Sequence, residues 1–302
     1  MADILTLVFR TFVSQTEVRK KLTVSPAPCS SLLVGDPSPP PCSSLLVGDP
    51  SPPPCSTLLV GDPGLGRSVL LLAAVTAASE MGVRVVFFSQ TQIQSLPASL
   101  QKVSTLSPDS LKRIQFSYPR TVEELLHQVA SLHESCNTSP TPPSLVIVDG
   151  LEGFLRGCGG GGHSASHPGR PSSAAHLAAL LSDSAVFLTQ LLKQRCSSSA
   201  PCRVIASFAP EADAVQAGAE ASATDPVLDV LDRYFQVRCT LDRDRTYEAA
   251  AAGLQEVWHV YLSGTGLTET AALSEDCEDR AAVAQEWQLV ISPDGSMEFK
   301  LV

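Results

Sequence analysis

Residues 61–68 have the types and spacing needed to bind phosphate groups. They match the pattern G-x-x-x-x-G-[K]-[ST], except that arginine stands where lysine is usual. Glycines in such a turn allow the backbone N–H groups to surround phosphate oxygens, and the helix that follows adds the positive end of its dipole. The predicted nucleotide-binding residues are Gly61, Asp62, Pro63, Gly64, Leu65, Gly66, Arg67 and Ser68.

A second chemical group, the carboxylate of Asp149, ends the apolar run SLVIVD within residues 144–150. A carboxylate at the end of a buried strand could share a magnesium ion with the hydroxyl of Ser68. We therefore expect Ser68 and Asp149 to be Mg²⁺ ligands, with ATP and Mg²⁺ as the cofactors. The alternative is a glycine-rich turn that joins a strand to a helix and binds no ligand.

Two residues depart from what fast hydrolysis of a phosphoanhydride needs. Arg67 keeps the positive charge, but it is a bulkier planar fork in a turn built around a compact ammonium group. Where a catalytic glutamate is expected, just after the run VVFF, the chain has Gln90, which can orient a water molecule but cannot take its proton. Gln90 is thus the candidate catalytic residue, and nucleotide binding with weak ATPase activity is favoured over efficient turnover.

These groups require a fold that brings strand ends together. Short apolar runs predict buried strands at 56–61, 83–89, 111–118, 144–150 and 202–208. Helices are expected at about 66–79, 121–134 and 174–194, and Thr121 and Glu124 form the capping box of the second. Pro-Asp-Gly between two alternating runs predicts a C-terminal hairpin. The expected class is α/β, with a mostly parallel sheet covered by helices and antiparallel C-terminal strands.

The N-terminal part of the chain is repetitive. The segment PCSSLLVGDPSPP occurs at 28–40 and again at 41–53, and a third copy begins at residue 54. Proline runs prevent the first two copies from continuing into a helix, so only the third, which runs on into the glycines, can bind phosphate. We therefore predict a poorly ordered N-terminal extension with 13-residue repeats at 1–53 and one ATPase domain at 54–302.

Composition limits the possible partners. The chain has 302 residues, 44% of them hydrophobic, and a formal net charge of −10. Such an acidic protein gains no overall electrostatic attraction to DNA or to an anionic membrane, so DNA contact needs a local basic patch or a partner. None of the nine cysteines forms a C-x-x-C pair that would indicate a zinc module. No apolar run reaches the roughly 18 residues of a membrane span, so we expect no membrane partner.

Several segments together resemble the RecA-like recombinase family over about residues 54–262, namely GDPGLGRS, VRVVFFSQ, SLVIVDGLEGFL and CRVIASF. LKRIQFSYPRTVEELL and SLVIVDGLEGFL are similar, more narrowly, to the recombinase paralogue that associates with a SWIM-type zinc-finger protein. The resemblance implies a RecA-like P-loop core and a nuclear ATP-binding protein that assists DNA repair by homologous recombination. The implied partners are a SWIM-type zinc-finger protein, the strand-exchange recombinase and its paralogues, and single-stranded DNA. The chain departs from the family at Arg67, at Gln90, and at Phe208, where the family has a polar sensor.

RecA-like cores hold DNA with two loops, which in this chain correspond to residues 156–173 and 209–226. The first loop contains Arg156 and Arg170, the candidate DNA-binding residues, although its glycines are also typical of a flexible spacer. The second loop is acidic and should repel DNA. We therefore expect weak intrinsic affinity for single-stranded DNA that a partner strengthens.

Two other functions stay open at this point. A P-loop enzyme acting on a small molecule would need an intact lysine, a base and an arginine-rich lid, and the chain shows none of these clearly. A non-catalytic scaffold with a degenerate P-loop would keep the fold without the nucleotide.

Overall fold

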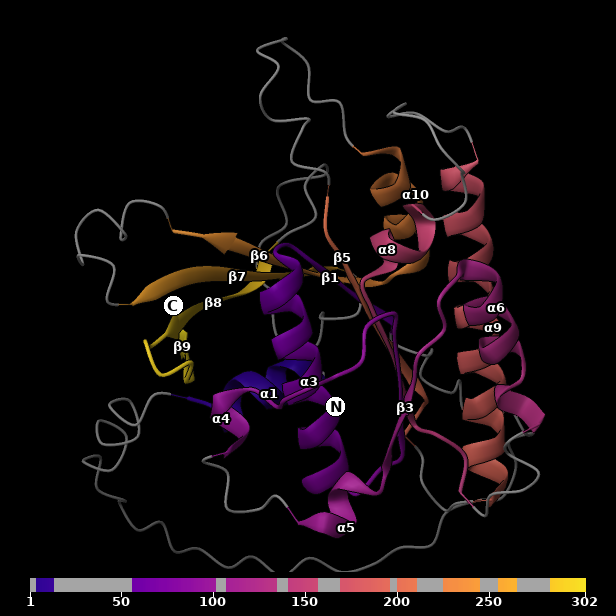
Figure 1. Ribbon diagram of the computed structural model, residues 1–302, viewed down its shortest axis with the longest axis horizontal. Coiled ribbons are helices and arrows are strands. Elements are labelled where there is room, and N and C mark those ends of the chain that lie inside the picture. Colours follow the sequence, from indigo (N-terminus) through magenta and orange to yellow (C-terminus); the bar gives the residue numbers. More distant parts are fainter. Residues whose placement is uncertain are drawn as a thin grey trace, which may run out of the picture.

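The computed structural model describes residues 4–13, 56–101, 107–134, 141–156, 169–195, 200–210, 225–244, 255–264 and 283–302. The centre of this structure is a sheet that has, within those ranges, nine strands in the order β3-β2-β4-β5-β1-β6-β7-β8-β9. Helices lie against both faces of the sheet (Figure 1).

The first six strands in this order run parallel to one another. They are β3 (Ile114–Ser117), β2 (Val85–Ser89), β4 (Leu145–Asp149), β5 (Arg203–Phe208), β1 (Ser56–Val60) and β6 (Val237–Arg243). Every residue of β2, β4 and β5 is buried, which explains why these strands appear in the sequence as continuous apolar runs. The strand β1, which precedes the glycine turn, is separated from β4 by β5.

The remaining strands extend the sheet in antiparallel fashion. They are β7 (Glu256–Gly264), β8 (Val283–Ile291) and β9 (Met297–Leu301). The predicted Pro-Asp-Gly turn joins β8 to β9, and in it the Gly295 N–H donates to the Ser292 carbonyl over 2.8 Å. The predicted architecture, an α/β fold with a mostly parallel sheet covered by helices and with antiparallel C-terminal strands, is confirmed.

Two groups of helices cover the two faces of the sheet (Figure 1). One group is α1 (Ile4–Thr11), α3 (Pro63–Ser79), α4 (Ala98–Gln101) and α5 (Pro108–Leu111). The other is α6 (Val122–Ala130), α8 (Leu151–Arg156), α9 (Arg170–Arg195) and α10 (Pro226–Tyr234). By length and composition α9 could cross a membrane. Its buried leucines, however, belong to the apolar core that it forms with the sheet and with α6, α8 and α10, so we interpret it as a core helix.

Helix α1 belongs to the core, whereas we expected residues 1–53 to be poorly ordered. Its apolar side chains Ile4, Leu5, Val8 and Phe9 are at most 2% exposed. The Phe9 ring stacks on Phe299 of β9 at a centroid distance of 4.6 Å, and the Phe299 N–H donates to the Phe12 carbonyl over 2.8 Å. Residues 14–53, with the first two repeats, lie outside the described residues, so the boundary at residue 54 stays a prediction.

Candidate nucleotide-binding site

The carboxyl ends of β1, β2, β4 and β5 lie at one edge of the sheet, because these strands are parallel. The register pairs Ser89 at the end of β2 with Asp149 at the end of β4. A Cβ atom placed on Gly66 would lie 3.7 Å from the Cβ of Ser207. The first turns of α3 therefore pack directly on the end of β5, above the polar strand ends.

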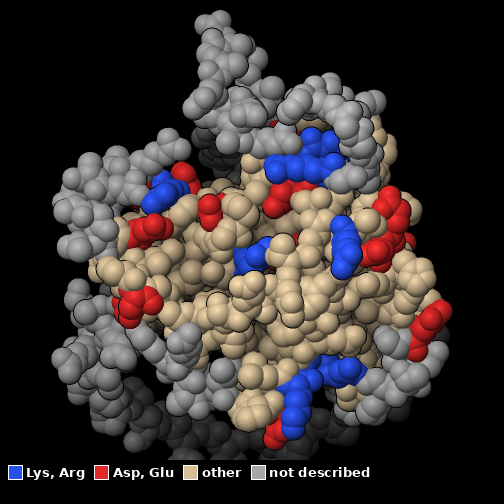
Figure 2. All heavy atoms as spheres, in the orientation of Figure 1, with Lys and Arg blue, Asp and Glu red and all other residues tan. Residues whose placement is uncertain are grey.

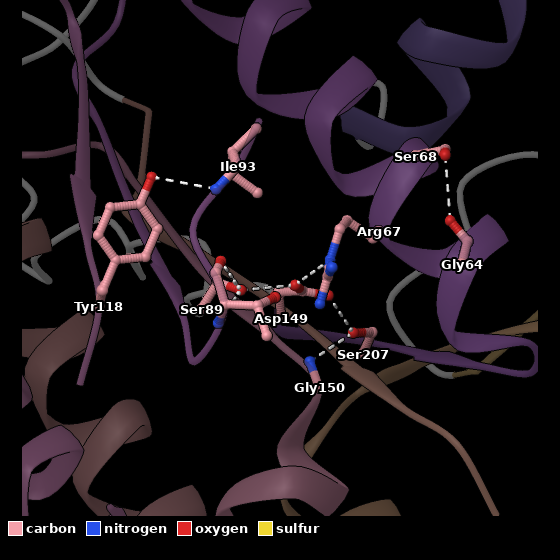
Figure 3. A network of polar contacts seen from close by, with 10 residues as sticks. Gly64, Arg67, Ser68, Ser89, Ile93, Tyr118, Asp149, Gly150 and Ser207 are labelled. Atoms are coloured by element: carbon pink, nitrogen blue, oxygen red, sulfur yellow. Dashed lines mark hydrogen bonds and ion pairs between the residues drawn. The ribbon is translucent and has the colours of Figure 1, made fainter. Parts of the chain in front are cut away.

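The carboxylate of Asp149 is the centre of a polar network at this edge (Figure 3). Its Oδ2 accepts a hydrogen bond from Arg67 Nε over 2.7 Å and another from the Ser89 hydroxyl over 2.9 Å. Its Oδ1 lies 3.4 Å from the Ser207 hydroxyl, which in turn accepts from the Gly150 N–H over 2.9 Å. The structure thus brings the predicted residues Arg67 and Asp149 into direct contact.

This network compensates the cost of burying a charge. The Asp149 side chain is only 2% exposed, whereas that of Arg67 is 41% exposed. A carboxylate removed from water is destabilising unless it is paired and hydrogen-bonded, and here one guanidinium and two hydroxyls serve that purpose. The terminal amino groups of Arg67 form no hydrogen bond with the described residues, and so they can bind a further anion.

The sequence interpretation did not identify Ser89 and Ser207 as site residues. Each is a hydroxyl near the carboxyl end of a buried strand, and both are nearly inaccessible to solvent. A polar residue in such a place, on strands that flank the strand of Asp149, is the signal that could have found them. Phe208, predicted to replace the family's polar sensor, is buried at the end of β5, and the adjacent Ser207 makes the polar contact with Asp149.

The turn at 61–68 differs from the open phosphate loop that we expected. Helix α3 begins at Pro63 rather than near residue 66, so Gly64, Leu65 and Gly66 are helical. Asp62 caps the helix: its Oδ1 accepts from the Leu65 N–H and its carbonyl from the Gly66 N–H, both over 2.8 Å. The physical reason is local, because an aspartate cap followed by proline in the first turn is a strong helix start.

Gly61 is the residue that allows the chain to leave β1 and enter this cap. Its φ of +151° is one that side-chain-bearing residues rarely adopt, and a Cβ there would lie 2.8 Å from the backbone oxygen of Leu241. The glycine is therefore required by backbone conformation and by close packing against β6.

The two predicted magnesium ligands do not form a metal site in this geometry. The Ser68 hydroxyl donates to the Gly64 carbonyl of its own helix over 3.0 Å. Arg67, and not Ser68, is the α3 residue that reaches the Asp149 carboxylate (Figure 3). Magnesium requires an octahedron of oxygen ligands, and a guanidinium in contact with the carboxylate blocks that arrangement. The residues of this chain thus do not fit Mg²⁺ as they are placed.

The side chain of Gln90, the candidate catalytic residue, is hydrogen-bonded at one end and packed against a glycine at the other. Its Nε2 donates to the Arg120 carbonyl over 3.0 Å, and its Oε1 lies so close to Gly153 that no side chain would fit there. The described contacts of Gln90 are thus with the start of α6 and with α8, and not with the turn at 61–68.

Glu152, in the first turn of α8, adds a second acidic group beside Asp149. Its Oε2 accepts from the Ala209 N–H over 2.9 Å and so connects α8 to the residue that follows β5. Burial raises the pKa of the Glu152 carboxyl, and the negative charge of Asp149 adds a smaller effect in the same direction. The sequence interpretation gave Glu152 no role.

The two candidate DNA-binding residues lie on neighbouring helices. Arg156 ends α8 and is exposed, and Arg170 begins α9. Figure 2 shows Lys and Arg side chains gathered at the end of the molecule where α8 and α10 lie. Residues 157–168 and 211–224, which contain most of the two predicted DNA loops, lie outside the part of the chain that is described.

The strand β1 is followed by a glycine turn and by helix α3, and Arg67 of this helix contacts the aspartate that ends β4, two places along the sheet. This arrangement defines a P-loop protein of the RecA-like class. No protein-family model matches the chain. The chain is 35% identical to the mouse ATPase SWSAP1 over 177 residues, which are 59% of this chain and 54% of the mouse protein. It is also 35% identical to the human ATPase SWSAP1 over 184 residues, or 60% of this chain and 69% of the human protein. The chain therefore belongs to the SWSAP1 family.

Among solved structures, the chain is similar to the RadB recombinase, with 14% identity and a TM-score of 0.49 over 82% of this chain and 90% of that chain. It is also similar to a KaiC-like protein from Pyrococcus horikoshii, with 11% identity and a TM-score of 0.47 over 82% and 89% of the two chains.

Proposed function

We propose that this chain is an ATP-binding RecA-like recombinase paralogue with weak ATPase activity that assists homologous recombination DNA repair. The observation that carries this proposal is the contact between Arg67, at the start of α3, and Asp149, at the end of β4. It places a positively charged fork and a helix start above the polar strand ends. The ATPase named among the relatives supports the same activity, although the match spans about half of the mouse protein.

The structure suggests how a triphosphate would be held. The Leu65 N–H, which here bonds to the capping side chain of Asp62, is a donor that a phosphate oxygen can take over. The exposed end of Arg67 supplies two further donors in a fork that matches phosphate oxygens. Hydrolysis is expected to be slow, because Gln90 is held by Arg120 and Gly153.

Binding of a fluorescent ATP analogue to the full chain tests the proposal. We expect Arg67→Gln to lower the affinity by about tenfold, since a charged hydrogen-bond donor to phosphate is lost. Arg238→Gln is the matched control, because Arg238 also pairs with an aspartate, Asp232, over 2.8 Å at another place in the molecule. If neither the wild type nor the control binds the analogue, the alternative function, a non-catalytic scaffold with a degenerate P-loop, is the correct one.

We further propose that the protein acts in the nucleus with a SWIM-type zinc-finger protein and with the strand-exchange recombinase and its paralogues on single-stranded DNA. Arg156 and Arg170 are the proposed DNA contacts, and the positive charge near α8 and α10 supports them (Figure 2). The net charge of −10 favours weak binding that a partner strengthens.

Two experiments test this wider proposal. Co-purification with a SWIM-domain protein should succeed for the full chain, and failure would remove that partner. Single-stranded DNA should bind weakly at low salt, and an Arg156→Ala, Arg170→Ala double variant should bind less than a Lys112→Ala, Lys193→Ala variant, which loses the same charge elsewhere. Equal binding by the two double variants would remove Arg156 and Arg170 from the DNA site.

A further inference from the structure

The charge balance at Asp149 is unusual for a P-loop site. Asp149 is nearly inaccessible to solvent and needs a cation, and Arg67 provides it through its Nε atom at 2.7 Å. A lysine at position 67 would reach forward to the phosphates as a compact ammonium group and leave the aspartate for a metal. Arginine can do both, because its Nε binds the carboxylate while its terminal amino groups form no hydrogen bond with the described residues.

The carboxylate oxygens of Asp149 are already engaged by donors. Oδ2 accepts from Arg67 and Ser89, and Oδ1 lies within hydrogen-bonding reach of Ser207. The second expected metal ligand, Ser68, bonds to the Gly64 carbonyl. A magnesium ion would have to displace a guanidinium held in a charged hydrogen bond, which costs more than displacing water.

We infer that the Arg67–Asp149 pair replaces Mg²⁺ in this chain, so that nucleotide binding does not require a divalent cation. This inference rests on the proposed nucleotide-binding function and deepens it. Asp149 acts as a positioning residue: it holds the guanidinium so that the terminal amino groups bind the phosphates. Since the pair is neutral overall, whereas a lysine with a metal ion would leave the site positive, the affinity for triphosphate is modest.

The test measures the affinity of the full chain for a fluorescent ATP analogue in excess Mg²⁺ and in EDTA. For the wild type we expect the two dissociation constants to agree within about threefold, since no metal ligand is lost. For Arg67→Lys we expect binding to be at least about tenfold tighter with Mg²⁺, because the lysine frees Asp149 for the metal. Arg238→Lys makes the same chemical change in the pair with Asp232 and should behave as the wild type does.

A second variant separates a positioning role from a purely structural one. In the wild-type background Asp149→Asn should weaken binding by the same factor with and without Mg²⁺, because it acts only through Arg67. In the Arg67→Lys background the same substitution should abolish the dependence on Mg²⁺. Thermal unfolding confirms that each variant is folded before binding is measured.

The outcomes distinguish this inference from the function on which it rests. If the wild type binds the analogue only when Mg²⁺ is present, the inference is wrong and the proposed nucleotide binding stands. If Arg67→Lys binds equally well in both buffers, the inference is also wrong. If the wild type binds in neither buffer, the proposed function itself has failed.

Discussion

Two regions of the molecule share the same construction, yet only one is a candidate site. Helix α3 and helix α10 both begin with an aspartate cap followed by proline, at Asp62-Pro63 and Asp225-Pro226. Both regions also contain an arginine–aspartate pair of almost the same length, 2.7 Å for Arg67–Asp149 and 2.8 Å for Arg238–Asp232.

The difference lies in burial and in what surrounds each pair. Asp149 is 2% exposed and bonded to two buried hydroxyls, whereas both side chains of the Arg238–Asp232 pair are 35% exposed. Burial raises the pKa of Asp232 even with Arg238 beside it, so that pair adds little stability. A cap and an ion pair are therefore not enough to make a site; the polar ends of parallel strands beneath the helix start are also needed.

Removing the two aspartates should give the largest difference between the regions. We expect Asp149→Ala to lower the free energy of unfolding by about 2–3 kcal/mol, because two buried hydroxyls and Arg67 lose their partner. The value is below that of a fully buried pair because Arg67 can return to water. We expect Asp232→Ala to cost less than about 1 kcal/mol. Urea unfolding measures both, and equal losses would show that the two pairs are energetically alike.

Removing the two helix caps should separate stability from binding. Asp62→Ala and Asp225→Ala should each cost about 1 kcal/mol, because each cap accepts a hydrogen bond from the first turn of its helix. Only Asp62→Ala should change affinity for the ATP analogue, and it should tighten it about fivefold, since a negative charge that competes with phosphate is removed. Weaker binding by Asp62→Ala would mean that the cap is part of the phosphate site.

The sequence allowed the strands, their parallel arrangement and the proximity of the turn at 61–68 to Asp149 to be predicted, since these depend on continuous apolar runs and on residues at their ends. It paired Asp149 with Ser68, however, whereas Arg67 is the residue that contacts it. It did not allow the register that places Ser89 and Ser207 around Asp149 to be predicted, because register is set by contacts between distant segments. The burial of α1 was missed for the same reason: Phe9 packs on Phe299, at the other end of the chain.

The start of α3 shows two local signals in competition. The glycine pattern at 61–68 is typical of an open phosphate loop, and the Asp-Pro pair within it is typical of a helix start. In the structure the helix start prevails. The conformation of these residues therefore differs from the open loop that the pattern predicts, and their role in nucleotide binding stays a prediction.

Gly66→Ala should strengthen α3 while it weakens the site. In α10 the equivalent position, four residues after the cap, is Asp229, so the helix start itself does not need glycine. A Cβ at Gly66 meets only ordinary contacts at 3.7 Å, and we expect the free energy of unfolding to rise by about 0.5–1 kcal/mol. The affinity for the ATP analogue should fall, because a side chain there hinders the approach of phosphate. Gly169→Ala, at an open position before α9, is the control that should leave affinity unchanged.

The smallest expected effect concerns Glu152, the second acidic residue beside Asp149. Burial raises the pKa of Glu152 in the folded state, so the unfolded chain releases the carboxyl proton more readily than the folded chain does. The stability that the protonated carboxyl contributes is therefore lost as the pH rises above 4.5, the ordinary pKa of this group. Glu152→Gln keeps an acceptor for the Ala209 N–H and does not ionise. The variant should therefore match the wild type near pH 4.5 and become the more stable of the two as the pH approaches 7. Urea unfolding at several pH values measures this difference.

If Glu152→Gln instead loses stability relative to the wild type as the pH rises from 4.5 to 7, the hydrogen bond from Ala209 favours the ionised carboxylate more than burial penalises it.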